Sequence, residues 1–115
     1  MKRDDDFLRE LLIQMEESND RIFIVPNTLD GANSKEIHHI LILCDYGYAE
    51  QLNDHAYRLT AHGHDFIDSI RDDSVWEKTK AAVAETGGNA TIEMIKTLAT
   101  GFLKKKVSEH TGIEI

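Results

Sequence analysis

Residues 34–60, SKEIHHILILCDYGYAEQLNDHAYRLT, contain the pattern that decides the fold. Apolar side chains at helical spacing predict a helix over 34–45, which Asn33 or Ser34 caps and whose inward residues are Ile37, Ile40, Leu41 and Cys44. Two short runs, YGYAEQL and HAYRLT, follow and meet at Asn53-Asp54. Because asparagine and aspartate tolerate the positive φ angles of a tight hairpin turn, a helix followed by a β-hairpin is expected.

The residues before this stretch predict another helix and a strand. Asp4, Asp5 or Asp6 caps a first helix, with an apolar face of Phe7, Leu8, Leu11, Leu12 and Met15. The alternation in RIFIVP, residues 21–26, indicates a short strand that Pro26 ends. Residues 27–33, NTLDGAN, are typical of turns, and this segment is too short for a further full helix. The order helix, strand, helix, hairpin, helix is that of a winged helix-turn-helix, in which 34–45 stands as the recognition helix and 47–60 as the wing.

Three more helices are expected after the hairpin. Thr60 is placed to cap a helix that runs through Arg71, and Ser74 to cap the next. ETGGNA breaks the chain at Gly87-Gly88, and a last helix starts near Thr91 and closes with three lysines, Lys104 to Lys106, where cations suit the helix dipole. The predicted fold class is therefore α+β, mainly α: a winged-helix module over 1–73, and a C-terminal helical extension over 74–115 that packs on the same domain.

The inward residues of these elements predict one hydrophobic core. Each element contributes one or two large apolar side chains to it, and a chain of 115 residues is long enough to bury them without a disulfide or a metal. The expected contiguous cluster consists of Phe7, Leu11, Ile40, Leu59, Phe66, Ile70 and Trp76.

Charge and composition restrict the function classes. The net charge is −8, and residues 1–73 hold 7 Lys/Arg against 16 Asp/Glu, a net charge of −9. A nucleic-acid backbone binds through Lys and Arg, so this module has a poor electrostatic footprint for DNA. The only cysteine, Cys44, fits a reducing compartment. Neither a membrane span nor a signal peptide is expected, which favours the cytoplasm.

The stretch HDFIDSIRDDSVWEKTK, residues 64–80, looks at first like an enzyme signature. We interpret it as a helix junction. Asp73 or Ser74 accepts amide hydrogen bonds at the new helix start, and Arg71 closes the C-terminus of the preceding helix or pairs with Asp68. Trp76 packs across the bend. Capping explains each polar residue, so no catalytic carboxylate is assigned here.

Histidines 62 and 64 belong to His62-Gly63-His64-Asp65, which is similar to the His-x-His-x-Asp motif of metallo-hydrolases. In that motif the aspartate stands two places beyond the second histidine, whereas Asp65 is adjacent to it. We therefore expect no metal, with His62 exposed and His64 donating a hydrogen bond within the core or a cap.

The remaining reactive side chains also have structural interpretations. Of His38 and His39, one is expected to reach solvent and the other to pack near Tyr46 or the hairpin. Cys44 lies at helical spacing from Ile40, which is typical of a buried small hydrophobe rather than a reactive thiol. Because no nucleophile, phosphate-binding or nucleotide motif is present, we expect no catalytic residues and no cofactor.

Three stretches, MKRDDDFLRELLIQMEE, EIHHILILCDYGYAE and RLTAHGHDFIDSIRDDSVWEKTK, resemble the uncharacterised domain of unknown function 2513 family. The positions that match its pattern are Met1 to Asp4, His39, Leu43, Gly47, Leu59, Thr60, Gly63 to Phe66, Asp68, Arg71 to Asp73, Trp76 and Lys80. The similarity covers nearly the whole chain and departs at residues 42–45 and 48–49. It implies a small winged-helix protein of a kind common in phage and prophage genomes, and it implies no catalytic residues.

Two functions of different classes follow. The favoured one is a non-enzymatic winged-helix protein, a protein-interaction module of phage or mobile-element origin. The alternative is a winged-helix DNA-binding transcriptional regulator, which charge disfavours because the candidate recognition helix exposes one lysine beside Glu36 and Asp45. The candidate contacts to DNA or to a protein partner are Asn33, Ser34, Lys35, His38, His39 and Arg58.

Self-association is expected through the last helix. Its apolar stripe needs a cover, for which the helix over 7–15 is the natural candidate within the chain, but the Gly87-Gly88 break makes exchange with a second copy inexpensive. The predicted homodimer contacts are Ile95, Leu98 and Phe102.

Overall fold

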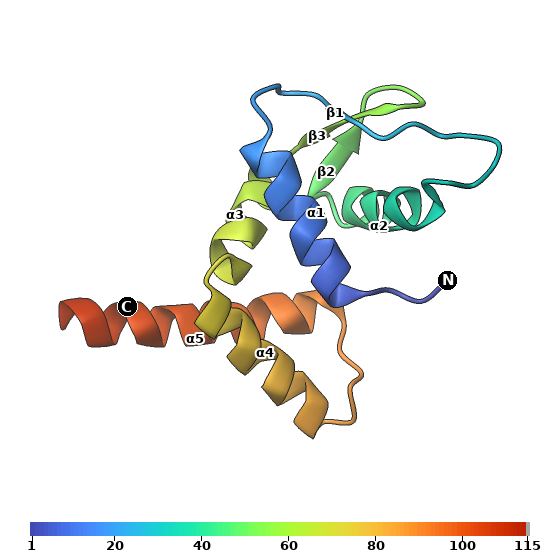
Figure 1. Ribbon diagram of the computed structural model, residues 1–115. Coiled ribbons are helices and arrows are strands. Elements are labelled where there is room, and N and C mark those ends of the chain that lie inside the picture. The colour runs from blue at the N-terminus through green and yellow to red at the C-terminus, as the bar shows by residue number, and fades with distance from the viewer. Residues whose placement is uncertain (115) are drawn as a thin grey trace. The chain divides into compact units, whose positions relative to one another are not determined.

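The computed structural model of the protein describes residues 1–114 and shows a mainly helical α+β fold (Figure 1). Within this range five helices accompany one small antiparallel sheet of three strands. Two compact units divide the chain, residues 1–67 and the part from Asp68 onward. In chain order the elements are α1 (Asp5–Glu17), β1 (Phe23–Ile24), α2 (Ser34–Asp45), β2 (Ala49–Gln51), β3 (Ala56–Leu59), α3 (Ala61–Ile70), α4 (Asp73–Glu85) and α5 (Ile92–Thr111).

Helix α1 begins as the sequence predicts. The side chain of Asp4 caps it by accepting a hydrogen bond from the Phe7 amide at 3.0 Å. The helix buries the predicted apolar face, except that Phe7 is only half-buried; the buried residues are Leu8, Leu11, Leu12 and Met15.

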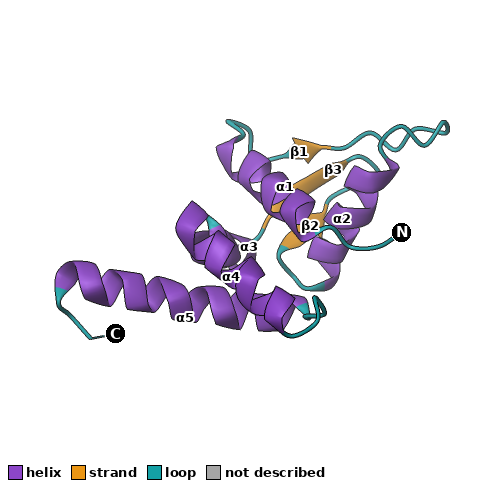
Figure 2. Cartoon of the chain, turned by 60° about the horizontal axis from the view of Figure 1, so that its bottom comes forward, coloured by secondary structure: helices purple, strands orange, loops and turns teal. Residues whose placement is uncertain are grey.

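The sheet has the strand order β1-β3-β2, and both pairings are antiparallel (Figure 2). Phe23 pairs with Tyr57 and Ile24 with Ala56, so alternate residues of β1 face opposite sides. Tyr57 is buried on the inner side, and so is Val25, the residue that follows β1. Ile24 lies on the outer side and is exposed.

The hairpin turn differs from the expectation. Among the described residues only glycines have a positive φ, so the predicted left-handed conformation at Asn53-Asp54 is wrong. Residues 52–55 form a longer connection instead. The Leu52 amide donates to the Ala56 carbonyl at 2.8 Å, and the Asn53 side-chain oxygen accepts from the His55 amide at 2.9 Å. This side-chain contact closes the turn with ordinary backbone angles.

Helix α2 has the predicted bounds but a different inward face. Its buried residues are His39, Ile40 and Leu43, whereas the predicted inward residue Leu41 is exposed. His39 Nε2 accepts a hydrogen bond from the Asp4 amide at 2.8 Å, and Nδ1 lies 2.7 Å from the Lys35 carbonyl. Both ring nitrogens are thus satisfied, which makes the histidine compatible with the core. The expected position near Tyr46 or the hairpin is therefore wrong, because the His39 ring packs 4.8 Å from that of Phe7.

The second unit begins at the helix junction. Arg71 forms the predicted ion pair with Asp68, at 2.9 Å. The cap of α4 is Asp72, which accepts from the Val75 amide at 3.0 Å, and not Asp73 or Ser74 as expected. Only Asp72 keeps extended backbone angles, as a cap requires, because Asp73 is already helical.

Helix α5 is longer than predicted. It ends at Thr111, where Gly112 takes the left-handed conformation, and not at the three lysines. The lysines therefore lie inside the helix, and the explanation of their position by the helix dipole is wrong.

Most of the predicted core residues are buried in their units. Leu11, Ile40 and Phe66 are buried in the first unit, and Ile70 and Trp76 in the second. Phe7 and Leu59 are half-buried. In the described part of the chain, no helix is both long and apolar enough to span a bilayer.

Candidate functional site

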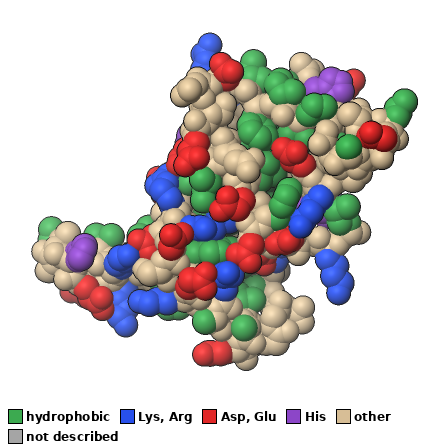
Figure 3. Space-filling view, viewed as in Figure 1, with side chains coloured by type: hydrophobic (Ala, Val, Ile, Leu, Met, Phe, Trp, Pro, Cys, Tyr) green, Lys and Arg blue, Asp and Glu red, His purple; other side chains and the backbone are tan. Residues whose placement is uncertain are grey.

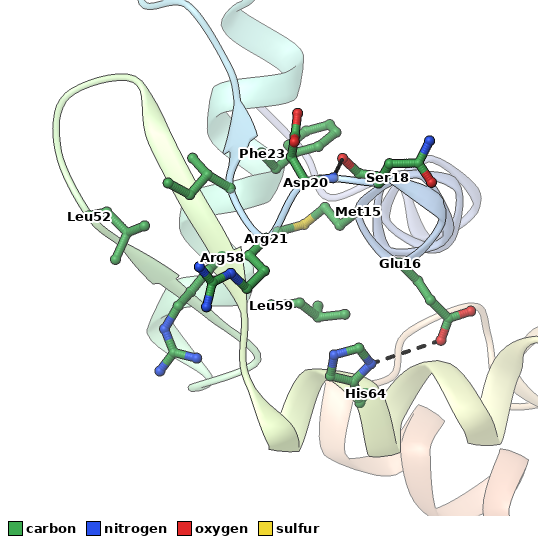
Figure 4. A pocket seen from close by; sticks show the side chains of 12 residues that line it. Met15, Glu16, Ser18, Asp20, Arg21, Phe23, Leu52, Arg58, Leu59 and His64 are labelled. Atoms are coloured by element: carbon green, nitrogen blue, oxygen red, sulfur yellow. Dashed lines mark hydrogen bonds and ion pairs between the residues drawn. The ribbon is translucent and has the colours of Figure 1, made fainter.

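An open pocket of about 590 Å³ lies in the first unit, between the end of α1, residues 18–22, the strands and the start of α3 (Figure 4). Its lining combines apolar and charged side chains. The apolar lining consists of Met15, Ile22, Phe23, Leu52 and Leu59, and the charged or titratable lining of Glu16, Asp20, Arg21, Arg58 and His64. A recess of this size with a few polar groups in its lining suits the binding of a side chain or a small molecule.

The charged groups of the lining differ in their partners. Arg58 Nε donates to Glu50 at 2.8 Å, which neutralises the guanidinium. His64 is exposed, and its Nδ1 lies 4.0 Å from Glu16, so the expected hydrogen bond within the core or a cap is absent and that prediction is wrong. Arg21 has no ion-pair partner within residues 1–114.

The candidate contacts on α2 are largely occupied by other parts of the unit. Lys35 Nζ lies 3.0 Å from the Asp4 carboxylate and 4.7 Å from the centre of the Phe7 ring. The Asn33 side chain donates to the Pro26 carbonyl at 2.9 Å. Backbone donation from Phe7, followed by the Lys35 ammonium, lowers the pKa of Asp4 below its ordinary value of 3.8.

The other candidate contacts differ in solvent exposure. Ser34 and Arg58 are exposed, His38 is half-buried and His39 has no accessible surface. Ser34 is therefore accessible to a partner and His38 partly so, while His39 joins α2 to the start of α1.

Cys44 is half-buried in α2. Burial, and secondarily the neighbouring Asp45 charge, raises the pKa of its thiol above the ordinary value of 9.0. The thiolate is the reactive form, so this environment opposes nucleophilic chemistry.

A polar cluster in the second unit has no counterpart in the sequence interpretation. Lys106 Nζ lies 2.6 Å from Asp72 and 3.0 Å from the Ser74 hydroxyl, which itself donates to Asp72 at 2.6 Å. The three-residue spacing from Asp72 to Val75 marks the cap, but nothing in the sequence indicates a lysine 34 residues away. The cluster fastens α5 to the start of α4.

This cluster predicts an acid-dependent contribution to stability. Lys106, then Ser74 and the Val75 amide, hold the pKa of Asp72 well below its ordinary value of 3.8. The stabilisation is therefore complete above the unfolded-state value and is lost as the pH falls below it toward the lower folded-state value. Lys106→Gln should lower the melting temperature at pH 7 and flatten its fall between about pH 4 and pH 2, as measured by circular dichroism. Lys105→Gln, one residue away and exposed, should leave the pH profile unchanged; equal profiles for both variants would contradict the fastening role.

The predicted dimer residues lie on α5. Ile95 is buried, and Leu98 and Phe102 are half-buried. For metals, no cluster of three or more His, Cys, Asp or Glu side chains suited to an ion occurs within residues 1–114.

Comparison with known proteins identifies relatives by sequence. The family described as "Hypothetical protein (DUF2513)" matches residues 2–89. An uncharacterised protein of Haemophilus influenzae is 26% identical over 118 residues, which cover 94% of this chain and 100% of that protein. No solved structure matches the chain. Because the family match spans well over half of the chain, the protein belongs to the domain of unknown function 2513 family.

Proposed function

We propose that the protein is a non-enzymatic winged-helix module that binds another protein. Two features support the winged-helix assignment: the order of the elements from α1 to α3, and the strand order β1-β3-β2, in which the first strand joins the hairpin. Residues 1–73 form the proposed module, with 74–115 as its helical extension. The observation on which protein binding rests is the apolar outer face of the sheet.

That outer face is defined by the strand register. Ile24 pairs with Ala56, whose carbonyl accepts from Leu52, so these three side chains form one row across the sheet, in which Ala56 is buried between two exposed neighbours. Ile22 lies two residues before Ile24. Ile24 is 57% exposed, Ile22 47% and Leu52 44%. The side chains on a solvated sheet face are normally polar. A contiguous exposed apolar patch typically marks a protein-binding surface.

The charges of the first unit disfavour the alternative, a DNA-binding regulator. Residues 1–67 hold 6 Lys/Arg against 13 Asp/Glu. Lys35 and Arg58 are the two cations among the candidate DNA contacts. Each of them is paired with a carboxylate. Basic and acidic side chains are interspersed over the face seen in Figure 3, which shows no continuous basic surface there.

Duplex DNA binding should therefore be weak. In fluorescence anisotropy at physiological salt, we expect an affinity below that of non-specific DNA binders, whose Kd is about 10⁻⁴–10⁻⁶ M, because the acidic unit repels phosphate. A micromolar signal that falls steeply with salt, and that Lys35→Ala and Arg58→Ala abolish, would instead favour the regulator.

Affinity purification from the native host tests protein binding directly. The wild type is compared with Ile24→Glu/Leu52→Glu, which places charge on the outer face, and with Met94→Glu/Ile113→Glu, which changes exposed apolar residues of the second unit. We expect quantitative mass spectrometry to find a partner that the first variant loses and the second keeps. Identical partner sets for all three proteins would contradict the proposal.

We also propose that the protein forms a homodimer by exchanging α5. Gly87 and Gly88 both have positive φ in the connection between α4 and α5, and a change of conformation there would release the helix. Ile95, Leu98 and Phe102 would then make their present contacts with the second copy. Light scattering should give the mass of a dimer for the intact chain and of a monomer after truncation at Glu85; an intact chain that stays monomeric at high micromolar concentration contradicts the exchange.

A further inference from the structure

Strand β1 has an open backbone edge. The Val25 amide donates to the His55 carbonyl at 2.8 Å, so these residues form a hydrogen-bonded antiparallel pair. Such pairs alternate along a ladder, which makes the adjacent pair of Ile24 and Ala56 a non-hydrogen-bonded one. The Ala56 carbonyl indeed accepts from Leu52 on the other side. The amide and carbonyl of Ile24 therefore point away from β3, toward solvent.

This edge is able to accept another strand. No residue within 1–114 forms a hydrogen bond with the backbone of Ile24 on that side. Unpaired amide and carbonyl groups at a sheet edge recruit extended segments, whose backbone supplies affinity while pockets for alternate side chains supply specificity.

The pocket adjoins the strand with which such a segment would pair. Phe23 of β1 is one of its lining residues, beside Met15 of α1 and Leu59 of β3 (Figure 4). An added strand along β1 projects every second side chain to the same face. One apolar side chain of such a segment would then face the apolar lining residues of the pocket.

Charge at the end of α1 indicates which segment fits. Glu16 and Glu17 occupy the last turn of α1 with no basic residue there, although carboxylates are unfavourable at the negative end of a helix dipole. Glu17 and Asp20 are exposed and form no ion pair with any described residue. The whole unit is also acidic, because it holds 13 Asp/Glu and only 6 Lys/Arg. These carboxylates therefore complement a cationic partner.

We infer that β1 and its pocket receive an extended segment of the partner protein, in which apolar residues alternate with lysine or arginine. This inference rests on the proposed protein-binding function and specifies its partner. A second copy of this chain does not fit the edge, because it would bring two acidic units together. Arg21 opposes the cations of the segment locally, so its removal strengthens binding.

Two blocked heptapeptides, one of alternating lysine and valine and one of alternating glutamate and valine, test the inference by NMR titration of the full chain. With the lysine peptide we expect saturable amide shifts at Ile24, Leu52 and Leu59 and slower hydrogen exchange of the Ile24 amide, which the new strand protects. The glutamate peptide should bind at least about tenfold more weakly.

Matched variants separate charge from backbone pairing. Glu17→Lys/Asp20→Lys should lower the affinity for the lysine peptide at least about tenfold. Glu36→Lys/Asp45→Lys makes the same charge change on α2 and should lower this affinity less than about threefold. Arg21→Glu should tighten it. Ile24→Pro removes the outward amide without touching the bonds to β3 and should abolish binding, while Ile24→Thr should retain it.

Four results would overturn the inference: no saturable shift with either peptide, equal affinity for both, shifts centred on α2 or β2, or unchanged exchange at Ile24. If Ile24→Pro does not fold, the exchange rate of the wild-type Ile24 amide decides the point alone. A partner that Ile24→Glu/Leu52→Glu loses, combined with any of these four results, would leave protein binding intact and reject only the added strand.

Discussion

Gly63→Ala should destabilise the first unit by at least about 3 kcal/mol, the upper part of the range for forced overpacking. A Cβ at Gly63 would overlap the Tyr48 carbonyl oxygen and would lie 2.7 Å from a methyl carbon of Leu59. The carbonyl cannot retreat freely, because it also accepts the Thr60 amide at 3.1 Å. Helix α3 must therefore move away from the hairpin or lose its first turn.

Urea unfolding monitored by circular dichroism measures this cost, and the chain provides a control of opposite sign. Gly101 lies inside α5, and a Cβ added there would meet no neighbouring side chain or element within 4 Å. Gly101→Ala should stabilise the protein by about 0.5–1 kcal/mol, because alanine loses less conformational freedom in a helix. Similar midpoints for Gly63→Ala and the wild type would show that α3 does not approach Tyr48 so closely.

Trp76→Ala should destabilise the second unit by about 3–5 kcal/mol, the range for deleting a buried aromatic side chain. Trp76 is only 4% exposed and lies in the first turns of α4, beside the buried Val75. Its removal leaves a cavity that the surrounding side chains fill only in part.

The measurement must use circular dichroism, since the variant has lost the only tryptophan fluorophore. Tyr46→Ala is the matched control, because this aromatic residue is exposed and its loss should cost less than about 1 kcal/mol. Near-wild-type stability of Trp76→Ala would mean that the tryptophan does not belong to the core and that the helix-junction interpretation is wrong.

Periodicity and capping chemistry predicted much of the fold. The helices over 5–17 and 34–45, the hairpin and the break at Gly87-Gly88 all follow from local signals. Such signals act within a few residues, so they survive without knowledge of the tertiary structure.

Prediction from the sequence failed where a residue distant in the chain determines the environment of a side chain. A histidine is polar and is expected near the surface, yet the amide of Asp4, 35 residues away, donates a hydrogen bond to the ring of His39 inside the core. Lys106 was predicted to lie at the end of a helix, yet it lies within α5 and donates a hydrogen bond to Asp72. No periodicity encodes either contact, and the pocket was missed for the same reason, since α1, the strands and α3 line it together.

The bond between His39 and Asp4 also bears on how the chain is made. The first helix has its cap at once, but the amide of that capping residue finds its acceptor only when residue 39 has left the ribosome. At a synthesis rate of about 5–20 residues per second, this delay lasts about 2–7 s. During that interval the apolar face of α1 does not yet have α2 to dock on, and the nascent helix is open to chaperones and proteases.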